Sequence, residues 1–313
     1  MVVKPGGSPT RGRPPFFFMA VLGLTILLSC VSYGQEYPFL WKIEIDANVT
    51  YDSLTSMFYY DYAMTNDPKN RGEVEKFTLI IWRDSASTVA YDTSGLQFAG
   101  DTFSENTFRK DFQYLGSWIV PVGIVSLPEG WEGWEFGRQP ELEVHKYAAF
   151  LKPGQSVAGI DLMSRGLPGV RECYVTPDFN VDVYLPNEEN IETIDSIENS
   201  TAYVGLTVGP WAPPARFDPL VLLDTLASYI RESRGEGWIT FEVVSEKYQL
   251  LLARTKKEIQ RSDLKAAILS LHEVLSDAET DRTRLLKPEA YALIRYNTEY
   301  LIRQMGIRKS AIR

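Results

Sequence analysis

The sequence predicts an antiparallel β-sandwich of immunoglobulin-like type followed by a small domain of four α-helices. Three observations predict this fold class. Between residues 37 and 208, apolar residues recur with a period of two in short runs that Gly and Pro separate. From residue 218 the apolar period lengthens to that of a helix. Between the two patterns lies GPWAPPARFDP, whose prolines are typical of a stiff linker.

The expected domain order is therefore a leader, a sandwich, a linker and a helical domain. A chain of 313 residues is long enough for two ordinary domains. We expect a signal peptide over residues 1–34, the β-sandwich over 35–208, a Pro-rich linker over 209–217 and the helical domain over 218–313.

The first residues have the features of an export signal. Basic residues precede an apolar run over residues 16–28, which is short for a membrane span of about 20 residues. Small residues before Gln35 predict cleavage after Gly34. In one alternative, a lipid is attached to Cys30, because LLSC resembles a bacterial lipobox. In another, the leader stays uncleaved as an anchor helix.

Cleavage after Gly34 would leave Cys173 as the single cysteine, so no internal disulfide could form. A lone cysteine in a strand-rich segment is usually a small buried hydrophobe. No second apolar run reaches the length of a membrane span. We therefore expect a secreted or cell-envelope protein with no transmembrane span after the leader.

The charge balance speaks against a nucleic-acid partner. The formal net charge is −9. Three of the 32 basic residues lie in the leader, which leaves 29 against 41 acidic residues and a net charge of −12. Aromatic residues make up 12% of the chain, which suits strands.

WKIEIDANV begins the strand pattern, with Trp41, Ile43, Ile45, Ala47 and Val49 expected on one face. Turn chemistry recurs at KPGQ and GLPG. Pro121 suggests an edge or a bulge, and the acidic stretch 187–200 is expected to be a solvated loop within the sandwich or a disordered excursion. Strands are predicted over residues 41–49, 58–66, 76–83, 87–92, 117–126, 141–151, 156–164, 172–176, 180–185 and 202–208.

Helix signals follow the linker. Asp218 is expected to cap a first helix that has Pro219 at its first position. Asp263 or Ser262 is expected to cap a third helix, and Pro288 to begin a fourth. The expected apolar stripes contain Leu220, Leu223, Ala227 and Ile230; Val244, Tyr248, Leu251, Thr255 and Ile259; Leu264, Ala267, Ile268, Leu271, Val274 and Leu275; and Tyr291, Ile294, Thr298, Leu301 and Met305.

This helical segment resembles the FIMAH-type domain found at the C-termini of bacterial secreted proteins. The resemblance covers about residues 218–305, and LHEVLS departs from the residues that name the family. It implies an accessory or interaction module and no catalytic residues. The segments that carry it are LDTLASYI, GWI, LLARTKKEI, LKAAILSLHEVLSDA and PEAYALIRYNTEYLI.

GWEGWEFG supplies the candidate ligand-binding residues Trp131, Trp134 and Phe136. Aromatic rings among glycines and glutamates could form a stacking platform for sugars. The alternative is a loop whose aromatic side chains tuck under the edge of the sandwich.

DFNVDVYLPNEE contains a weak calcium-loop pattern. The site needs a sharp turn at its sixth position, where the sequence has Val183 in place of Gly. Alternating apolar residues make a strand the favoured interpretation. The candidate ligands are Asp178, Asn180, Asp182 and Glu189.

The sequence predicts no catalytic residue, cofactor or metal. Its two histidines, His145 and His272, exclude multi-His metal sites. His272 begins a broken HExxH, whose last position is Ser276. Glu143 shares an expected strand face with His145 and Glu141, which is typical of a solvated face.

The expected function is that of a non-enzymatic protein that attaches to a protein or glycan partner at the cell exterior. One alternative is a glycan-binding module that uses Trp131 and Trp134. The other is an extracellular hydrolase with an unrecognised site.

Overall fold

A computed structural model describes residues 37–81, 122–135, 141–146, 150–180, 185, 191–211 and 217–311. By its internal contacts, Tyr37–Arg313 forms one compact unit. The expected leader, the strand expected at 87–92 and Pro121 lie outside the described residues.

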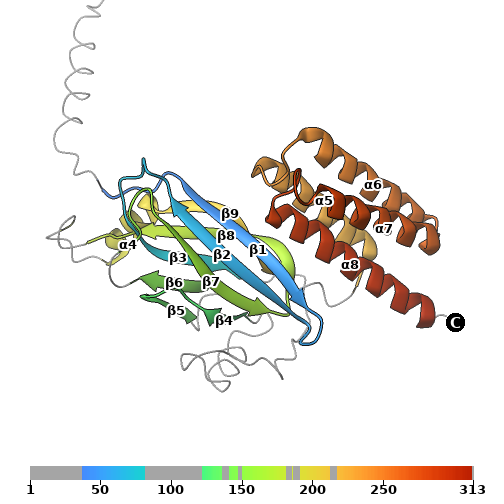
Figure 1. The fold of residues 1–313 in the computed structure, drawn as a ribbon, viewed down its shortest axis with the longest axis horizontal. Helices are drawn as coiled ribbons and strands as arrows, with labels where there is room; N and C mark the ends of the chain where they lie inside the picture. Colours follow the sequence, from blue (N-terminus) through green and yellow to red (C-terminus); the bar gives the residue numbers. More distant parts are fainter. Residues whose placement is uncertain are drawn as a thin grey trace, which may run out of the picture. The chain divides into compact units, whose positions relative to one another are not determined.

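In the described part of the chain, the first sheet is antiparallel, with the strand order β1-β2-β7-β4 (Figure 1). Strand β1 buries Ile43, Ala47 and Val49 and exposes Glu44 and Asp46, so the predicted alternation is confirmed there. The strands are β1 (Ile43–Asp52), β2 (Met57–Asn66), β7 (Ser156–Ser164) and β4 (Val122–Ser126).

The second sheet is also antiparallel and has the order β5-β6-β3-β8-β9. Its strands are β5 (Trp131–Glu135), β6 (Glu141–Lys146), β3 (Val74–Ile80), β8 (Leu167–Pro177) and β9 (Tyr203–Trp211).

The two sheets contact each other through Tyr62 of β2. Its hydroxyl donates to the carbonyl oxygen of Val208 in β9, with an O···O distance of 2.8 Å. Its ring lies 5.7 Å from that of Phe77 in β3. All three residues are buried, and apolar residues of both sheets belong to one continuous cluster. The sheets therefore share a core.

Strands β8 and β9 are longer than the sequence predicts. GLPG was expected to be a turn, but Leu167 and Gly169 lie in β8 and pair with Trp211 and Gly209. A Cβ on Gly169 would lie 2.7 Å from Cβ of Trp211, so the glycine permits a close approach of strands. The first residues of the expected linker thus belong to the sheet, and residues 212–216 lie outside the described residues.

The loop expected at 187–200 is wrong, because Ile191–Thr201 forms helix α4, which contacts β8. Isoleucines at 191, 194 and 197 give it an apolar spacing of three residues. The acidic residues between them give this segment the composition of a solvated loop and conceal that spacing.

After β9 the chain forms helices in which each contacts the next and α5 contacts α8 (Figure 1). The prediction of strands followed by helices is confirmed at this level. No described helix is long and apolar enough to cross a membrane. The helices are α5 (Pro219–Gly235), α6 (Glu242–Gln260), α7 (Leu264–Asp281) and α8 (Pro288–Ala311).

The predicted caps are confirmed. Asp218 Oδ1 accepts from the backbone N–H of Leu220 at 2.9 Å, and Asp263 Oδ1 accepts from that of Ala266 at 3.0 Å. The whole expected stripe of α8 is buried. In α5 the buried face is turned toward Leu226, and Ala227 is only half-buried.

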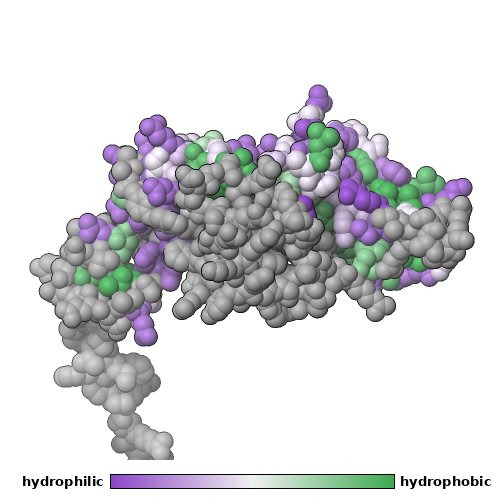
Figure 2. Space-filling model, turned by 90° about the horizontal axis from the view of Figure 1, so that it is seen from below, coloured by the Kyte–Doolittle hydropathy of each residue, from purple (hydrophilic) through white to green (hydrophobic). Residues whose placement is uncertain are grey.

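Residue types mix on the molecular surface. Figure 2 shows hydrophobic residues interspersed among hydrophilic ones on the described part of one face. Scattered apolar residues of this kind are ordinary on a folded protein.

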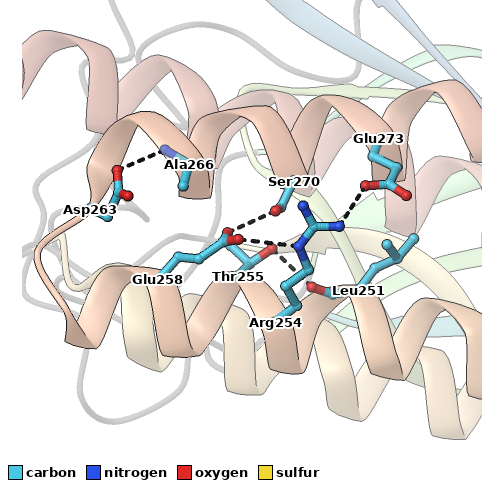
Figure 3. Close-up of polar contacts among 8 residues, drawn as sticks. All are labelled: Leu251, Arg254, Thr255, Glu258, Asp263, Ala266, Ser270 and Glu273. Carbon is cyan, nitrogen blue, oxygen red and sulfur yellow. Dashed lines mark hydrogen bonds and ion pairs between the residues drawn. The ribbon is translucent and has the colours of Figure 1, made fainter.

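Polar contacts join α6 to α7 (Figure 3). Arg254 lies between two carboxylates, with Nη1 at 3.0 Å from Oε2 of Glu273 and Nε at 3.2 Å from Oε1 of Glu258. Ser270 donates to Glu258 at 2.7 Å. These contacts fix how the two helices align.

Asp281, buried at the end of α7, makes a second polar connection. Its Oδ2 accepts from the hydroxyl of Tyr248 at 2.8 Å and lies 2.5 Å from Nζ of Lys247. Burial, together with this hydrogen bond, raises the pKa of Tyr248 above its ordinary value. The phenol therefore stays a donor to the carboxylate.

Contacts also join the helices to the second sheet. Asn297 Nδ2 of α8 donates to the carbonyl oxygen of Pro168 in β8 at 2.8 Å. The ring of Trp211 in β9 meets that of Tyr229 in α5 edge to face, with centroids 6.4 Å apart. The helical region is thus in direct contact with the strands.

Candidate functional site

Trp131 is buried rather than presented to solvent. It begins β5 and is 5% exposed. Nζ of Lys146 lies 5.7 Å from the ring centroid, which is within cation–π range. The indole Nε1 has no hydrogen-bond partner among the described residues. This ring packs in the core and is not a stacking platform in this conformation.

The register of β5 separates the two tryptophans of the expected platform. Trp131 pairs with Lys146, whereas Trp134 pairs with Glu143. Positions three apart on a strand fall on opposite faces of the sheet. The structure therefore does not bring these two positions together, and Phe136 and the side chain of Trp134 lie outside what is described.

Gly133, between the two tryptophans, lies where the first sheet approaches closely. A Cβ at this position would lie 2.1 Å from Cδ1 of Ile124 in β4. The glycine thus permits packing of β5 against β4.

The calcium candidates are only partly described. Asp178 directly follows β8 and donates its backbone N–H to the carbonyl oxygen of Glu73 at 2.8 Å. Burial and the nearby Glu73 raise the pKa of Asp178. Asn180 is exposed, and Asp182 and Glu189 lie outside the described residues. Among the residues described, no three His, Cys, Asp or Glu side chains are grouped as a metal site.

A polar cluster covers the outer face of the second sheet where α4 meets it. His145 Nε2 lies 2.9 Å from Oε2 of Glu143, and Nζ of Lys76 lies 3.9 Å from the same carboxylate. Lys76 also lies 3.7 Å from Glu198 of α4. Burial raises the pKa of Glu75, and the nearby carboxylates of Asp178 and Glu198 add to this. The cluster connects β3, β6 and α4 through charge pairs.

The residues of the broken HExxH lie on the surface of α7, as expected. His272 and Glu273 are exposed, and Glu273 pairs with Arg254. Cys173 is buried and free, and burial raises its pKa to about 12. Its thiol is therefore protonated, as expected for a small core residue.

Two aromatic residues are exposed ahead of β1, and one of them, Trp41, was predicted to be buried. Trp41 is 52% exposed and Phe39 is 45% exposed. The alternating pattern had put Trp41 on the buried face with Ile43, but β1 begins only at Ile43. Two positions apart, Phe39 and Trp41 alternate with the buried Pro38 and Leu40.

Asn70 holds this segment in place with its side chain. Its Oδ1 accepts from the backbone N–H groups of Trp41 and Lys42 at 3.0 and 3.2 Å. Its Nδ2 donates to the carbonyl oxygen of Lys42 at 2.6 Å and to Oδ1 of Asn66 at 2.7 Å. The Asn70 amide makes the backbone hydrogen bonds that a neighbouring strand would otherwise make. The period of apolar residues in the sequence does not reveal such a side-chain contact.

Comparison with known proteins adds little to this geometry. No family model matches the chain, and no curated protein matches it. Among solved structures, it is similar to a chain of the type VI secretion system TssK-TssF-TssG baseplate subcomplex. The identity is 11% and the TM-score 0.16, over 95% of this chain and 99% of the other. A TM-score this low establishes no common fold.

Proposed function

We propose that the chain is an exported, non-enzymatic protein that works by attachment to another macromolecule at the cell exterior. The leader pattern supports export. The observation that carries the proposal is the exposed pair Phe39 and Trp41. Burying a large aromatic side chain contributes about 1.5–3 kcal/mol. A partner that covered these two exposed side chains would therefore gain binding free energy.

The surroundings of the pair suit a binding role. The backbone at Trp41 is already fixed by Asn70, which lowers the entropy that binding must overcome. Lys42, the next residue in the chain, forms an ion pair with Asp67 at 3.6 Å and supplies polar groups in the same segment. Tryptophan with a polar rim is the composition typical of interface hot spots.

Retention on the producing cell tests this proposal. We would replace Cys30 by Ser to remove any lipid anchor, and compare the distribution of the chain between cells and medium. Phe39→Ala with Trp41→Ala should shift the chain into the medium without lowering its unfolding temperature. Leu54→Ala is the matched control, because Leu54 is a large exposed apolar residue outside the pair.

Equal retention of the double variant and the control would reject the aromatic pair as the attachment surface. A parent chain found wholly in the medium would reject attachment itself.

A glycan partner is the second candidate, now placed on Trp41 instead of Trp131. Sugar stacking needs an accessible ring, which Trp41 has and Trp131 lacks. On a glycan array, Trp41→Ala should abolish retention of the parent chain. If Trp131→Ala alone abolished it at unchanged stability, the site would lie at β5 after all.

We also propose the finer architecture that the sequence suggests. The inter-sheet contacts of Tyr62 support an immunoglobulin-like sandwich. The mutual contacts of α5, α6, α7 and α8 support a four-helix module of the FIMAH type. An experimental structure of residues 35–313 tests both.

A further inference from the structure

Strand β1 is an outer strand of the first sheet and pairs only with β2 in the described part of the chain. In an antiparallel ladder, every second residue directs its N–H and C=O groups away from the partner. Along an outer strand these groups lack a neighbouring strand and form a template for pairing with another chain. Ala47 and Val49 occupy such positions, because α8 contacts their backbone groups.

Two side chains of α8 bind these outward groups. The backbone N–H of Ala47 donates to Oε1 of Glu289 at 2.7 Å. The hydroxyl of Tyr296 donates to the carbonyl oxygen of Val49 at 3.3 Å. Helix α8 therefore supplies an acceptor for an outward N–H of β1 and a donor for an outward carbonyl oxygen of β1.

The two contacts are built into the core. Glu289 is 0% exposed, and Glu is almost never so buried without a partner. Burial raises the pKa of Glu289, and its oxygen can accept the Ala47 bond in either protonation state. The Tyr296 ring meets that of Phe58 edge to face at 5.2 Å, which positions the hydroxyl against β1.

We infer that Glu289 and Tyr296 take the place of a neighbouring strand along the outer edge of β1 in the described sheet, and that they keep β1 from pairing with β1 of a second copy. A second copy is the occupant we consider, because an outer strand can pair antiparallel with itself. Antiparallel pairing about Asn48 would set Ala47 of one copy opposite Val49 of the other. Such a pair exchanges both backbone hydrogen bonds, and the arrangement has the twofold symmetry of most homodimers.

Disulfide trapping tests the inference in the chain from Gln35 onward, which contains the compact unit Tyr37–Arg313. Asn48 is exposed, and Asn48→Cys would place two thiols opposite each other in the expected dimer. Cα atoms at such positions lie about 4.5 Å apart, which a disulfide can span. Cys173 is buried and does not compete.

We expect almost no cross-linked dimer from Asn48→Cys alone, and dimer as the main product after adding Glu289→Lys. The lysine has no acceptor for Ala47 and places a cation against its N–H. Glu289→Gln keeps an acceptor and should leave the chain monomeric. A folded Glu289→Lys chain that stays uncross-linked would overturn the inference.

Amide exchange in the Asn48→Cys chain gives a second readout, in case Glu289→Lys does not fold. Glu289→Ala should speed exchange at Ala47 by about tenfold or more, as loss of a buried hydrogen bond of about 1.5 kcal/mol requires. Tyr296→Phe keeps the ring and removes only the hydroxyl, and combined with Glu289→Ala it should again produce cross-linked dimer.

Glu299→Ala is the control on the same helix, because Glu299 pairs with Arg295. Exchange at Ala47 that is equally fast in the parent, in Glu289→Ala and in Glu299→Ala would reject the role of α8.

Discussion

Gly133 allows β5 to pack closely against Ile124 of β4. Any side chain there meets Cδ1 of Ile124, which a new Cβ would approach to 2.1 Å. Relief requires a new Ile124 rotamer or a shift of β4 or β5, and the rotamer change is costly because Ile124 is itself buried.

Gly133→Ala should therefore lower the free energy of unfolding by about 1–3 kcal/mol, the usual cost of overpacking. Urea unfolding measures it. Gly235→Ala is the control, because no atom lies within 4 Å of a Cβ there, and it should change stability by less than about 1 kcal/mol in the stabilising direction. Similar losses in both variants would contradict the packing argument.

Individual aromatic residues were the hardest to place from sequence. The period of two put Trp41 with the core, and the structure exposes it; for Trp131 the sequence left a surface platform and a buried position open, and the structure buries it. The error at Trp41 arises because period arguments depend on where a strand begins. β1 begins after Trp41, whereas β5 begins at Trp131.

The end of α7 depends on Asp281 for its contact with α6. Asp281→Ala would leave the Tyr248 hydroxyl buried without its acceptor, while Lys247 would keep Asp277 at 3.2 Å. We expect a loss of about 2–3 kcal/mol in the free energy of unfolding. Chemical denaturation followed by circular dichroism measures it.

Asp277→Ala is the matched comparison, since it removes a partly exposed carboxylate from the same lysine. It should cost less than about 1 kcal/mol. If both variants lost the same amount, Lys247 rather than Tyr248 would carry the contribution.

Whole elements were predicted where local chemistry decides them. Asp218 and Asp263 cap helices as expected, and strand β7 has the predicted bounds. Helix α4 was missed because its composition is that of a solvated loop. Strand β5 was missed because its glycine serves a contact with β4, which no local signal reveals.

At the scale of the molecule, strands and helices form one compact unit. We expect both to unfold in a single transition, because the contacts of Glu289, Asn297 and Tyr229 with the strands are lost together. Hydrogen exchange read peptide by peptide by mass spectrometry should give coincident urea midpoints for β2 and α6.

Glu289→Lys is the informative variant for this measurement, since it should separate the two midpoints. Separate midpoints in the parent chain would show that the helices fold independently of the sheets.

The sequence predicted that strands precede helices, but it did not predict that the helices pack against the strands. The prolines after β9 indicated a spacer, but β9 itself extends to Trp211, which contacts Tyr229. Contacts between residues far apart in the chain produce no periodic pattern in the sequence, so sequence analysis does not predict them.

The bond between Ala47 and Glu289 joins residues 242 positions apart, and this separation has a consequence for biosynthesis. At about 5–20 residues per second, a ribosome takes about 10–50 s to proceed from one to the other. Throughout that interval a nascent chain displays β1 without its cover, next to identical chains growing on the same messenger. Safe production of this protein therefore requires that a chaperone shield the N-terminal strands, or that their assembly wait for the last helix.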